Sequence, residues 1–259
     1  MREKTIRVGF LFRAMAIFRV ERMIIFHEDP SNPSRNALLI KLLCEYMSAA
    51  PYLRRILFRL RPELRYAGLL PPLNVPIHPE SPLPPKDGWE LRDGLVRKRG
   101  GLAVIHAGLK RDMALESSLR DGARVIVMAR MVGEKIRVKV RSARRVPYYT
   151  VTEVQVYEGP LSGLVQRYSY SIATDRKGTL FPEVASKLKH DLQALKSPIC
   201  VAFGSYKRGL NEIAALQGVP FESLFTVCVN FIPEQGVRSV RTEEAVYAVL
   251  ATLNNLTAL

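Results

Sequence analysis

Two patterns of hydrophobic and polar positions divide the chain. Over residues 2–70, and again from about residue 166 to the end, apolar residues recur at three- and four-residue spacing between short apolar runs. This spacing predicts helices that alternate with buried strands. Between about residues 88 and 165 the period is two, which is typical of strands with one buried face. The sequence therefore predicts an α/β domain interrupted by a small all-β insert.

The N-terminal part, residues 1–75, predicts three helices and one strand. A helix is expected over residues 2–20, a strand over 23–26, and a second helix from the N-cap Ser34 to about residue 49. Pro51 starts a shorter helix that we expect to carry Arg54, Arg55, Arg59 and Arg61. Residues 71–88 are rich in proline, which breaks helices and central strands, so we expect a stiff linker over residues 76–87.

The insert, residues 88–165, is expected to contain strands over residues 102–106, 123–130, 135–141 and 151–157. In the third of these, alternate valines and isoleucine face one way and basic residues face the other. The pattern predicts a small β-barrel, similar to an OB-fold, whose basic and aromatic surface binds RNA. The alternative is a solvated basic face on a structural insert. The candidate RNA-binding residues are Arg137, Lys139, Arg141, Arg144, Arg145, Tyr148 and Tyr149.

The C-terminal part, residues 166–259, predicts strands over 168–173, 199–203 and 225–230, and helices over 182–195 and from Thr242 to about 255. The last two strands are apolar on both faces, as in a parallel sheet, and each is followed by a loop rich in glycine or proline. Ligands of such sheets bind beyond the carboxyl ends of the strands, so these loops predict a pocket for a polar small molecule. The alternative is that both loops are ordinary turns.

Charge is the strongest compositional signal. The chain of 259 residues has a net charge of +15. Residues 1–75 and 86–167 contribute +7 and +8, whereas residues 168–259 contribute only +1 and Glu80 contributes −1. This split indicates a polyanionic partner bound away from the small-molecule loops. Three cysteines without a CxxC spacing, the lack of a signal-peptide pattern and the lack of a membrane-length apolar run favour a cytoplasmic protein.

Several chemistries are excluded by missing motifs. The chain has neither GxxxxGK[ST] nor GxGxxG, which argues against a Walker loop and a Rossmann-type nucleotide site. Its four histidines are scattered without metal-ligand spacing, so no metal site is expected. Nothing is similar to a nucleophilic triad or to the paired carboxylates of a hydrolase.

The order of residues in the C-terminal loops is similar to that of the SPOUT RNA methyltransferases. It begins with Phe203-Gly204-Ser205 and Gly209-Leu210 and continues with Asn230, Pro233, Gln235-Gly236 and Val240-Arg241-Thr242-Glu243-Glu244. Residues 13–20, 52–58 and 64–73 also resemble the archaeal and eukaryotic branch with an inserted β-domain. The resemblance implies an α/β fold with a parallel sheet, a C-terminal deep trefoil knot, an OB-like insert and a homodimer.

The resemblance also implies a cofactor, S-adenosyl-L-methionine, and a site. Its cofactor-binding residues would be Arg176, Phe203, Gly204, Asn230, Ile232, Pro233, Gln235, Gly236, Val240, Arg241 and Thr242. Arg13 and Arg54 are candidates for positioning the target, or alternatively arginines of the dimer interface or the solvent-facing surface. No general base is evident, which favours methylation of a uridine base over a ribose hydroxyl, because a uridine ring nitrogen needs little help to lose its proton.

The expected function is therefore S-adenosylmethionine-dependent methylation of RNA, most simply ribosomal RNA. The alternative is a non-catalytic RNA-binding or ribosome-assembly factor that retains the fold. The chain departs from the family at its start, because these proteins begin with a strand and this sequence begins in a helix. Either the start site is mis-assigned or the sheet lacks a strand.

Overall fold

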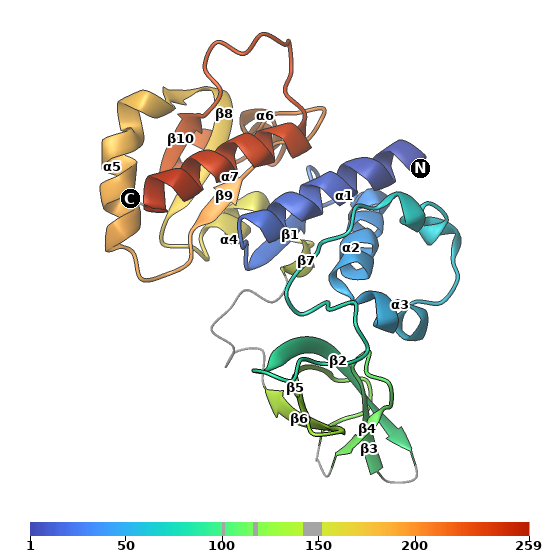
Figure 1. Ribbon diagram of the computed structural model, residues 1–259. Coiled ribbons are helices and arrows are strands. Elements are labelled where there is room, and N and C mark those ends of the chain that lie inside the picture. Colours follow the sequence, from blue (N-terminus) through green and yellow to red (C-terminus); the bar gives the residue numbers. More distant parts are fainter. Residues whose placement is uncertain (100–101, 116–118, 142–151, 259) are drawn as a thin grey trace. The chain divides into compact units, whose positions relative to one another are not determined.

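The structure, a computed structural model, describes residues 1–99, 102–115, 119–141 and 152–258 (Figure 1). The chain forms two compact units. One unit combines residues 1–42 with residues 153–259, and the other contains residues 43–152. The expected fold class, a mixed α/β protein with parallel strands and a separate antiparallel sheet, is confirmed at this level.

Parallel strands form the centre of the first unit. β8 (Ser171–Leu180) lies between β10 (Val227–Asn230) and β9 (Cys200–Ala202), and both neighbours run parallel to it. β1 (Arg22–Phe26) and β7 (Glu153–Tyr157) form a second, two-stranded parallel sheet. In each strand of the larger sheet the carboxyl end therefore lies at the same edge.

Helices cover both faces of the larger sheet, and alternation along β8 shows which residues face which layer. Ile172 packs in one cluster with residues of α5 (Phe181–Ala194) and α7 (Thr242–Ala258). Ala173, the next residue, packs in another cluster with residues of α4 (Leu161–Val165) and α6 (Leu210–Leu216). Both clusters are apolar, so burial on the two faces of the sheet stabilises this unit.

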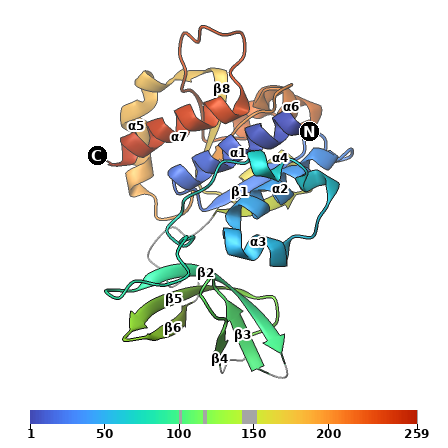
Figure 2. The same cartoon turned by 45° about the vertical axis from the view of Figure 1, so that its right-hand side comes forward.

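The N-terminal helix α1 (Arg2–Ile17) packs beside α7, as both views show (Figures 1 and 2). Arg7 donates to Glu243 through Nε at 2.7 Å and through Nη2 at 3.2 Å. The Tyr247 hydroxyl donates to the Phe10 carbonyl at 3.1 Å. Since Glu243 lies in the first turn of α7, α1 holds the start of α7 in place.

The second unit contains an antiparallel sheet with the strand order β4-β3-β2-β5-β6, which curls until it is nearly closed (Figure 2). Val96, Ile105 and Val127 form its core together with Val138 and Val140. The strands are β2 (Glu90–Arg99), β3 (Leu102–His106), β4 (Met113–Leu115), β5 (Arg124–Val132) and β6 (Lys135–Arg141).

In the second unit α3 (Pro51–Leu57) packs against β2, where Leu53 and Leu95 are buried in one cluster. The other helical segments of this unit are the end of α2 (Arg35–Ser48) and the short 3-10 turns η1 (Pro62–Leu64) and η2 (Ala67–Leu69); a further 3-10 turn, η4 (Phe221–Ser223), belongs to the first unit. Asp93 accepts hydrogen bonds from the Ala50 backbone and from Arg124, and the Tyr52 hydroxyl donates to the Asp93 carbonyl at 2.9 Å. The Tyr52 ring lies so close to Gly108, at φ +66°, that a Cβ there would be 2.5 Å from it.

The proline-rich segment 76–87 contains no helix or strand, as expected, but it is not a free linker. The Pro82 carbonyl accepts from the Lys110 amide at 3.2 Å, and the Pro85 carbonyl accepts from the Met131 amide at 2.9 Å. The Ser81 carbonyl accepts from Arg92 at 2.6 Å. The segment is therefore bound along the antiparallel sheet and belongs to the second unit.

Three expected elements differ from the structure, and two of its strands were not expected. Residues 153–157 pair with β1 and lie in the first unit, whereas we expected residues 151–157 to be a strand of the insert. β2 and β4 were not predicted. β8 continues to Leu180 because its pairing with β10 resumes at Thr179 after a register shift. α3 ends at Leu57, so Arg59 and Arg61 lie beyond it.

Candidate functional site

The predicted ligand loops lie where the sequence placed them, after the carboxyl ends of parallel strands. Residues 203–209 follow β9 and lead into α6, and residues 231–241 follow β10 and lead into α7. Residues 174–178 of β8 lie between its two stretches of pairing with β10. Three segments that are distant in sequence therefore meet at one edge of the sheet, which is the usual ligand position in open α/β sheets.

The loop after β9 is held in shape by its own backbone. The Ser205 amide donates to the Arg208 carbonyl at 2.9 Å, and the Ser205 hydroxyl accepts from the amides of Lys207 and Arg208, each at 3.0 Å. A Cβ at Gly204 would lie 2.8 Å from the Arg208 carbonyl oxygen. Only glycine fits at this position, because any side chain would collide with the loop's own backbone.

An ion pair fixes the same loop to Glu28, two residues after the end of β1. Arg208 donates to Glu28 through Nη1 at 2.5 Å. Burial alone would raise the pKa of Glu28, but hydrogen bonds from Ser205 and Arg208 and the charges of Arg208 and Lys207 together outweigh it and lower the pKa. Glu28 is therefore ionised at neutral pH and restrains the loop.

Asn230 joins the loop after β10 to β8. Its side-chain Nδ2 donates to the Arg176 carbonyl at 2.9 Å, and its Oδ1 accepts from the Ile232 amide at 3.0 Å. Asn230 is buried, so both hydrogen-bonding atoms of its amide group are used in positioning backbone. Phe231, the next residue, stacks on Phe181 with the ring centroids 5.4 Å apart.

The start of α7 touches the loop after β9. The Thr242 hydroxyl donates to the Gly204 carbonyl at 3.4 Å. The Arg241 amide donates to the Glu244 carboxylate at 2.9 Å, which caps the helix and favours its dipole. The C-terminal helix thus begins against the glycine loop that follows a different strand.

The structure brings the predicted cofactor residues into two contacting groups. Arg176, Asn230 and Ile232 form one, and Gly204 and Thr242 form the other. Phe203 packs into the core beneath them. The other predicted residues lie along the loop that projects beyond β10 in Figure 1, namely Pro233, Gln235, Gly236, Val240 and Arg241.

The two arginines predicted to position the target both have protein contacts. Arg54 donates through Nε to the Ala49 carbonyl at 3.1 Å, and its guanidinium lies 4.9 Å from the centre of the Tyr46 ring. Burial lowers the pKa of Arg54. Arg13 lies half-buried on α1, where its charge acts to lower the pKa of Tyr247 although burial raises that pKa overall.

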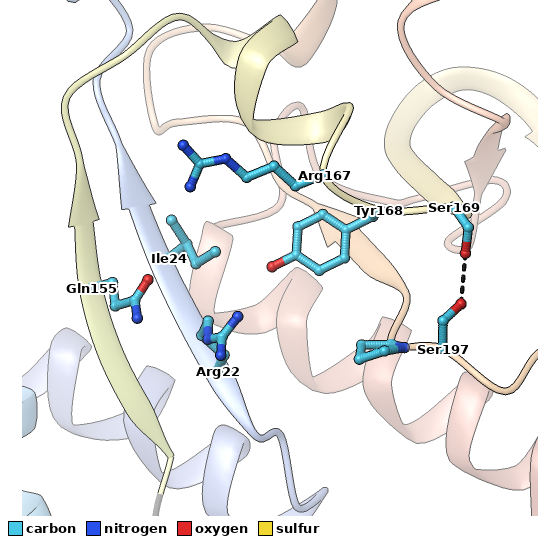
Figure 3. Close-up of a pocket in the computed structure, with 8 residues that line it drawn as sticks. Arg22, Ile24, Gln155, Arg167, Tyr168, Ser169 and Ser197 are labelled. Atoms are coloured by element: carbon cyan, nitrogen blue, oxygen red, sulfur yellow. Dashed lines mark hydrogen bonds between the residues drawn. The ribbon is translucent and has the colours of Figure 1, made fainter.

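A cavity of about 330 Å³ lies elsewhere in the first unit, as Figure 3 shows. It is lined by Arg22 and Ile24 of β1, by Gln155 of β7 and by residues that precede β8 and β9, so it lies near the amino ends of β8 and β9. A hydrogen bond to Tyr168 raises the pKa of Arg22, and the hydroxyls of Ser169 and Ser197 are 2.6 Å apart. This cavity is distinct from the loops predicted to bind the cofactor.

On the second unit, β6 carries the predicted basic face. Arg137, Lys139 and Arg141 are exposed, whereas Val138 and Val140 pack against the core. Trp89, which sequence reasoning missed, lies beside this face with Arg130 and Lys139 over its ring. Two features of the sequence could have identified it: Trp89 is the only tryptophan of the chain, and it directly precedes a segment rich in basic residues. The four remaining candidates, Arg144, Arg145, Tyr148 and Tyr149, fall outside the described residues.

Within the part of the chain that the structure describes, no group of three or more histidine, cysteine or acidic side chains could hold a metal ion. No helix among these residues has the length and apolar character required to cross a membrane.

The fold defines a mixed α/β protein whose predicted ligand loops lie at the carboxyl edge of parallel strands, and the family comparison adds a class. Residues 1–253 match the family described as "Putative RNA methyltransferase". The chain belongs to this family of SPOUT RNA methyltransferases, as the loop residues indicated.

Relatives match over nearly the whole chain. An uncharacterized protein of Halobacterium salinarum is 31% identical over 281 residues, which cover 99% of this chain and 93% of the relative. The 28S rRNA (uridine-N(3))-methyltransferase of Drosophila melanogaster is 27% identical, covering 95% of this chain and 56% of the relative. The human protein of the same name is 26% identical, covering 96% and 72%.

Proposed function

We propose that this protein is an S-adenosyl-L-methionine-dependent methyltransferase that modifies N3 of a uridine in ribosomal RNA. The observation that carries the proposal is the family match over residues 1–253, together with relatives named for this reaction in fly and human. The site supports it, because the loops that carry the family residues contact one another at the ligand edge of the sheet.

The residues at this edge fit the proposed cofactor. Gly204 and Gly209 leave backbone uncovered by side chains after β9, and a Cβ at Gly209 would lie 3.2 Å from Asp175 Oδ2. A carboxylate at this position suits the positive charge of a sulfonium. We infer that Phe203, Gly204, Ile232 and Thr242 form the walls of the cofactor site and that the exposed Arg176 binds the cofactor carboxylate.

When bound, the cofactor supplies an electrophilic methyl group, and the protein's task is to hold the uridine in line with it. The N3 proton of uridine is acidic enough to leave without a strong base. Asn230 uses its amide to fix the two backbone segments of the site. Arg13 and Arg54 remain our candidates for orienting the target through its phosphates.

We further propose that the segment from β9 to α7 forms the trefoil knot of the SPOUT fold. Two observations support it: β10 pairs with β8 although β9 precedes it in the chain, and α7 begins against the Gly204 loop. An experimental structure in which residues 200–245 pass beside the neighbouring loop without threading through it would exclude the knot.

A homodimer is proposed on the same resemblance. Phe10 and Ile17 lie one heptad apart on α1 and are 49% and 51% exposed, which leaves apolar surface for a second copy. Light scattering of the purified protein should give twice the monomer mass of 29.2 kDa. A monomer at micromolar concentration would contradict this proposal.

We propose that the antiparallel sheet of the second unit is OB-like and binds RNA. The face of β6 that carries Arg137, Lys139 and Arg141 is exposed and basic. We extend the proposed RNA surface to Arg144, Arg145, Tyr148 and Tyr149, which follow β6 in sequence. Basic grooves with aromatic rings suit single-stranded RNA.

Calorimetry separates an enzyme from a non-catalytic RNA-binding protein with the same fold. The purified protein should release heat when titrated with S-adenosylmethionine and should transfer a labelled methyl group to ribosomal RNA transcripts. Arg176→Gln should weaken cofactor binding, whereas Lys187→Gln, on α5, should not. Binding of RNA without binding of S-adenosylmethionine would establish the non-catalytic alternative and exclude the proposed reaction.

A further inference from the structure

Trp89, the chain's only tryptophan, is flanked by two cations on the antiparallel sheet. The Arg130 guanidinium carbon is 4.7 Å from the centre of the indole ring, and Lys139 Nζ is 5.0 Å from it. Trp89 and Arg130 are half-buried, whereas Lys139 is exposed. The ring is thus fixed in place beside a side chain that can move away from it.

Strand pairing explains why these residues share one face. Glu90 pairs with Ala129, so the preceding Trp89 is adjacent to Arg130 on β5, and Arg130 pairs with Arg137 on β6. Ala129 and Val138 alternate with these residues and lie in or against the core. We name this surface, made of Trp89, Arg130, Arg137 and Lys139, the Trp89 platform.

The positive charges of the platform are not neutralised within it. Among the residues that the structure describes, no carboxylate forms an ion pair with Arg130, Arg137 or Lys139. The buried Arg130 Nε has no hydrogen-bond partner in the same part of the chain. A surface that served only to stabilise the sheet would be expected to pair these cations with acidic residues, as Arg97 pairs with Asp121.

We propose that the Trp89 platform stacks a nucleobase of single-stranded RNA on the indole ring, with Arg137 and Lys139 binding the flanking phosphates. This inference rests on the proposed function and names the residue that engages the RNA base outside the methylation site. Lys139 leaves the ring as the base takes its place, and its ammonium group then contacts a phosphate. Arg130 stays against the indole and increases its attraction for the stacked base through its charge.

The chemistry of the platform favours a nucleic acid over an acidic polypeptide. A carboxylate needs only the cations, whereas a nucleobase also uses the flat ring, and every base offers a π-face. The partner is therefore recognised by stacking and by charge together. Removing the ring while keeping all three cations distinguishes the two kinds of partner.

The single tryptophan makes the test direct, because all tryptophan fluorescence of the full chain comes from this platform. Titration with a short oligouridylate at low salt should quench the emission in a saturable manner. Trp89→Ala should weaken binding, measured by filter retention, about 5- to 150-fold, the range measured for loss of one stacked base. Trp89→Phe, which keeps a ring, should recover most of the affinity.

Tyr66→Ala provides the matched control. Tyr66 also lies beside an arginine, with Arg65 5.6 Å from its ring, but it is in the second unit outside the sheet. This variant should bind RNA as tightly as the native chain. Circular dichroism of each variant establishes whether it is folded, and the fluorescence quenching of the native chain carries the test if Trp89→Ala is unfolded.

The outcomes separate this inference from the proposed function. RNA binding and methyl transfer that persist unchanged in Trp89→Ala, without quenching in the native chain, would overturn the stacking role and leave the methyltransferase proposal standing. Failure of the native chain to bind any RNA would overturn both. Equal quenching by polyglutamate would show that the platform binds acidic polypeptides and would also overturn the inference.

Discussion

Gly204 and Gly236 lie in the two predicted cofactor loops, and the structure gives them different constraints. A Cβ at Gly204 would lie 2.8 Å from the Arg208 carbonyl oxygen and 3.1 Å from the Gly209 Cα. A Cβ at Gly236 would have no neighbour within 4 Å. The sequence predicted both as cofactor residues, but only the three-dimensional closure of the loop shows that a side chain at Gly204 would collide with the loop backbone.

Gly204→Ala should therefore disturb the loop, whereas Gly236→Ala should not. We expect Gly204→Ala to cost about 1–3 kcal/mol of unfolding free energy, the usual cost of overpacking, and to weaken S-adenosylmethionine binding at least tenfold. RNA affinity should stay nearly unchanged, because the Trp89 platform belongs to the second unit and Gly204 belongs to the first. Calorimetry and filter binding measure the two affinities. Equal loss of both in Gly204→Ala would count against the pocket assignment.

His78 is a residue whose environment the sequence did not reveal. Burial, followed by the charges of Arg54 and Arg124, lowers its pKa to about 4, although a hydrogen bond with the Ser48 backbone acts in the other direction. Its Nε2 is buried without a hydrogen-bond partner among the described residues. The folded protein therefore keeps this imidazole neutral at pH values where the unfolded chain protonates it.

This difference predicts a pH-dependent stability. As the pH falls from about 6.5 to about 4, the unfolded state binds a proton at His78 that the folded state does not, so the folded state loses stability, by at most about 3 kcal/mol. His78→Gln should remove this contribution, and the exposed His190→Gln should not. Urea unfolding of the native protein and the two variants at pH 7 and pH 4.5 measures the change in unfolding free energy with pH. An equal change in the native protein and in His78→Gln would contradict the prediction.

At the scale of elements, alternation along the sequence was sufficient for β3, β5 and β6 but not for β2. Arg92 and Asp93 are 0% and 2% exposed, so two charged residues occupy positions that a sequence pattern assigns to the surface. Their charges are compensated by partners distant in sequence: Glu90 and carbonyls at 81, 107 and 108 for Arg92, and Arg124 for Asp93. No local pattern records such partners.

Strand partners could not be predicted for the same reason. β7 has the apolar–polar alternation of the insert, yet it pairs in parallel with β1, more than a hundred residues away in the chain. In contrast, α5, α7 and the strands β9 and β10 were predicted close to their bounds, because each is a local apolar pattern with a proline, a glycine or a capping residue near one end. Local sequence signals therefore identified the predicted cofactor loops, whereas the pairing of β7 with β1 depends on residues distant in the chain.

Arg92 offers a test of how β2 is held. Its guanidinium ties the proline-rich segment and the loop after β3 to this strand, so Arg92→Met should destabilise the protein by about 3–5 kcal/mol, the usual cost of breaking a buried charged network. Arg97 lies on the same strand but forms an exposed pair with Asp121, so Arg97→Met should cost about 1 kcal/mol or less. Urea unfolding measures the free energy of unfolding of both variants. Similar losses would show that Arg92 does not hold the proline-rich segment and the loop after β3 to β2.

For the whole molecule, the uneven distribution of charge has a functional consequence. The C-terminal segment that carries the predicted cofactor loops is almost neutral, whereas the unit that carries β6 is strongly basic. This division matches a small, partly charged cofactor on one unit and a polyanion on the other. It was visible in the sequence, although the sequence did not show that Trp89 belongs to the basic face.

Reversing Arg137, Lys139 and Arg141 to glutamate should weaken RNA binding and flatten its dependence on salt, because fewer counterions are released on binding. Cofactor affinity should not change. The matched variant reverses Lys187, Lys189 and Lys196, which lie in or just after α5, and should keep the native salt slope. Binding isotherms at several salt concentrations measure both slopes, and an unaltered slope in the β6 variant would place the RNA surface elsewhere.

The most direct test of the account is mass spectrometry of ribosomal RNA nucleosides from cells with and without this gene. We predict that 3-methyluridine disappears from one position of the ribosomal RNA when the gene is deleted and returns when the native gene, but not the Gly204→Ala variant, is restored. An unchanged content of methylated nucleosides in the deletion strain would contradict it.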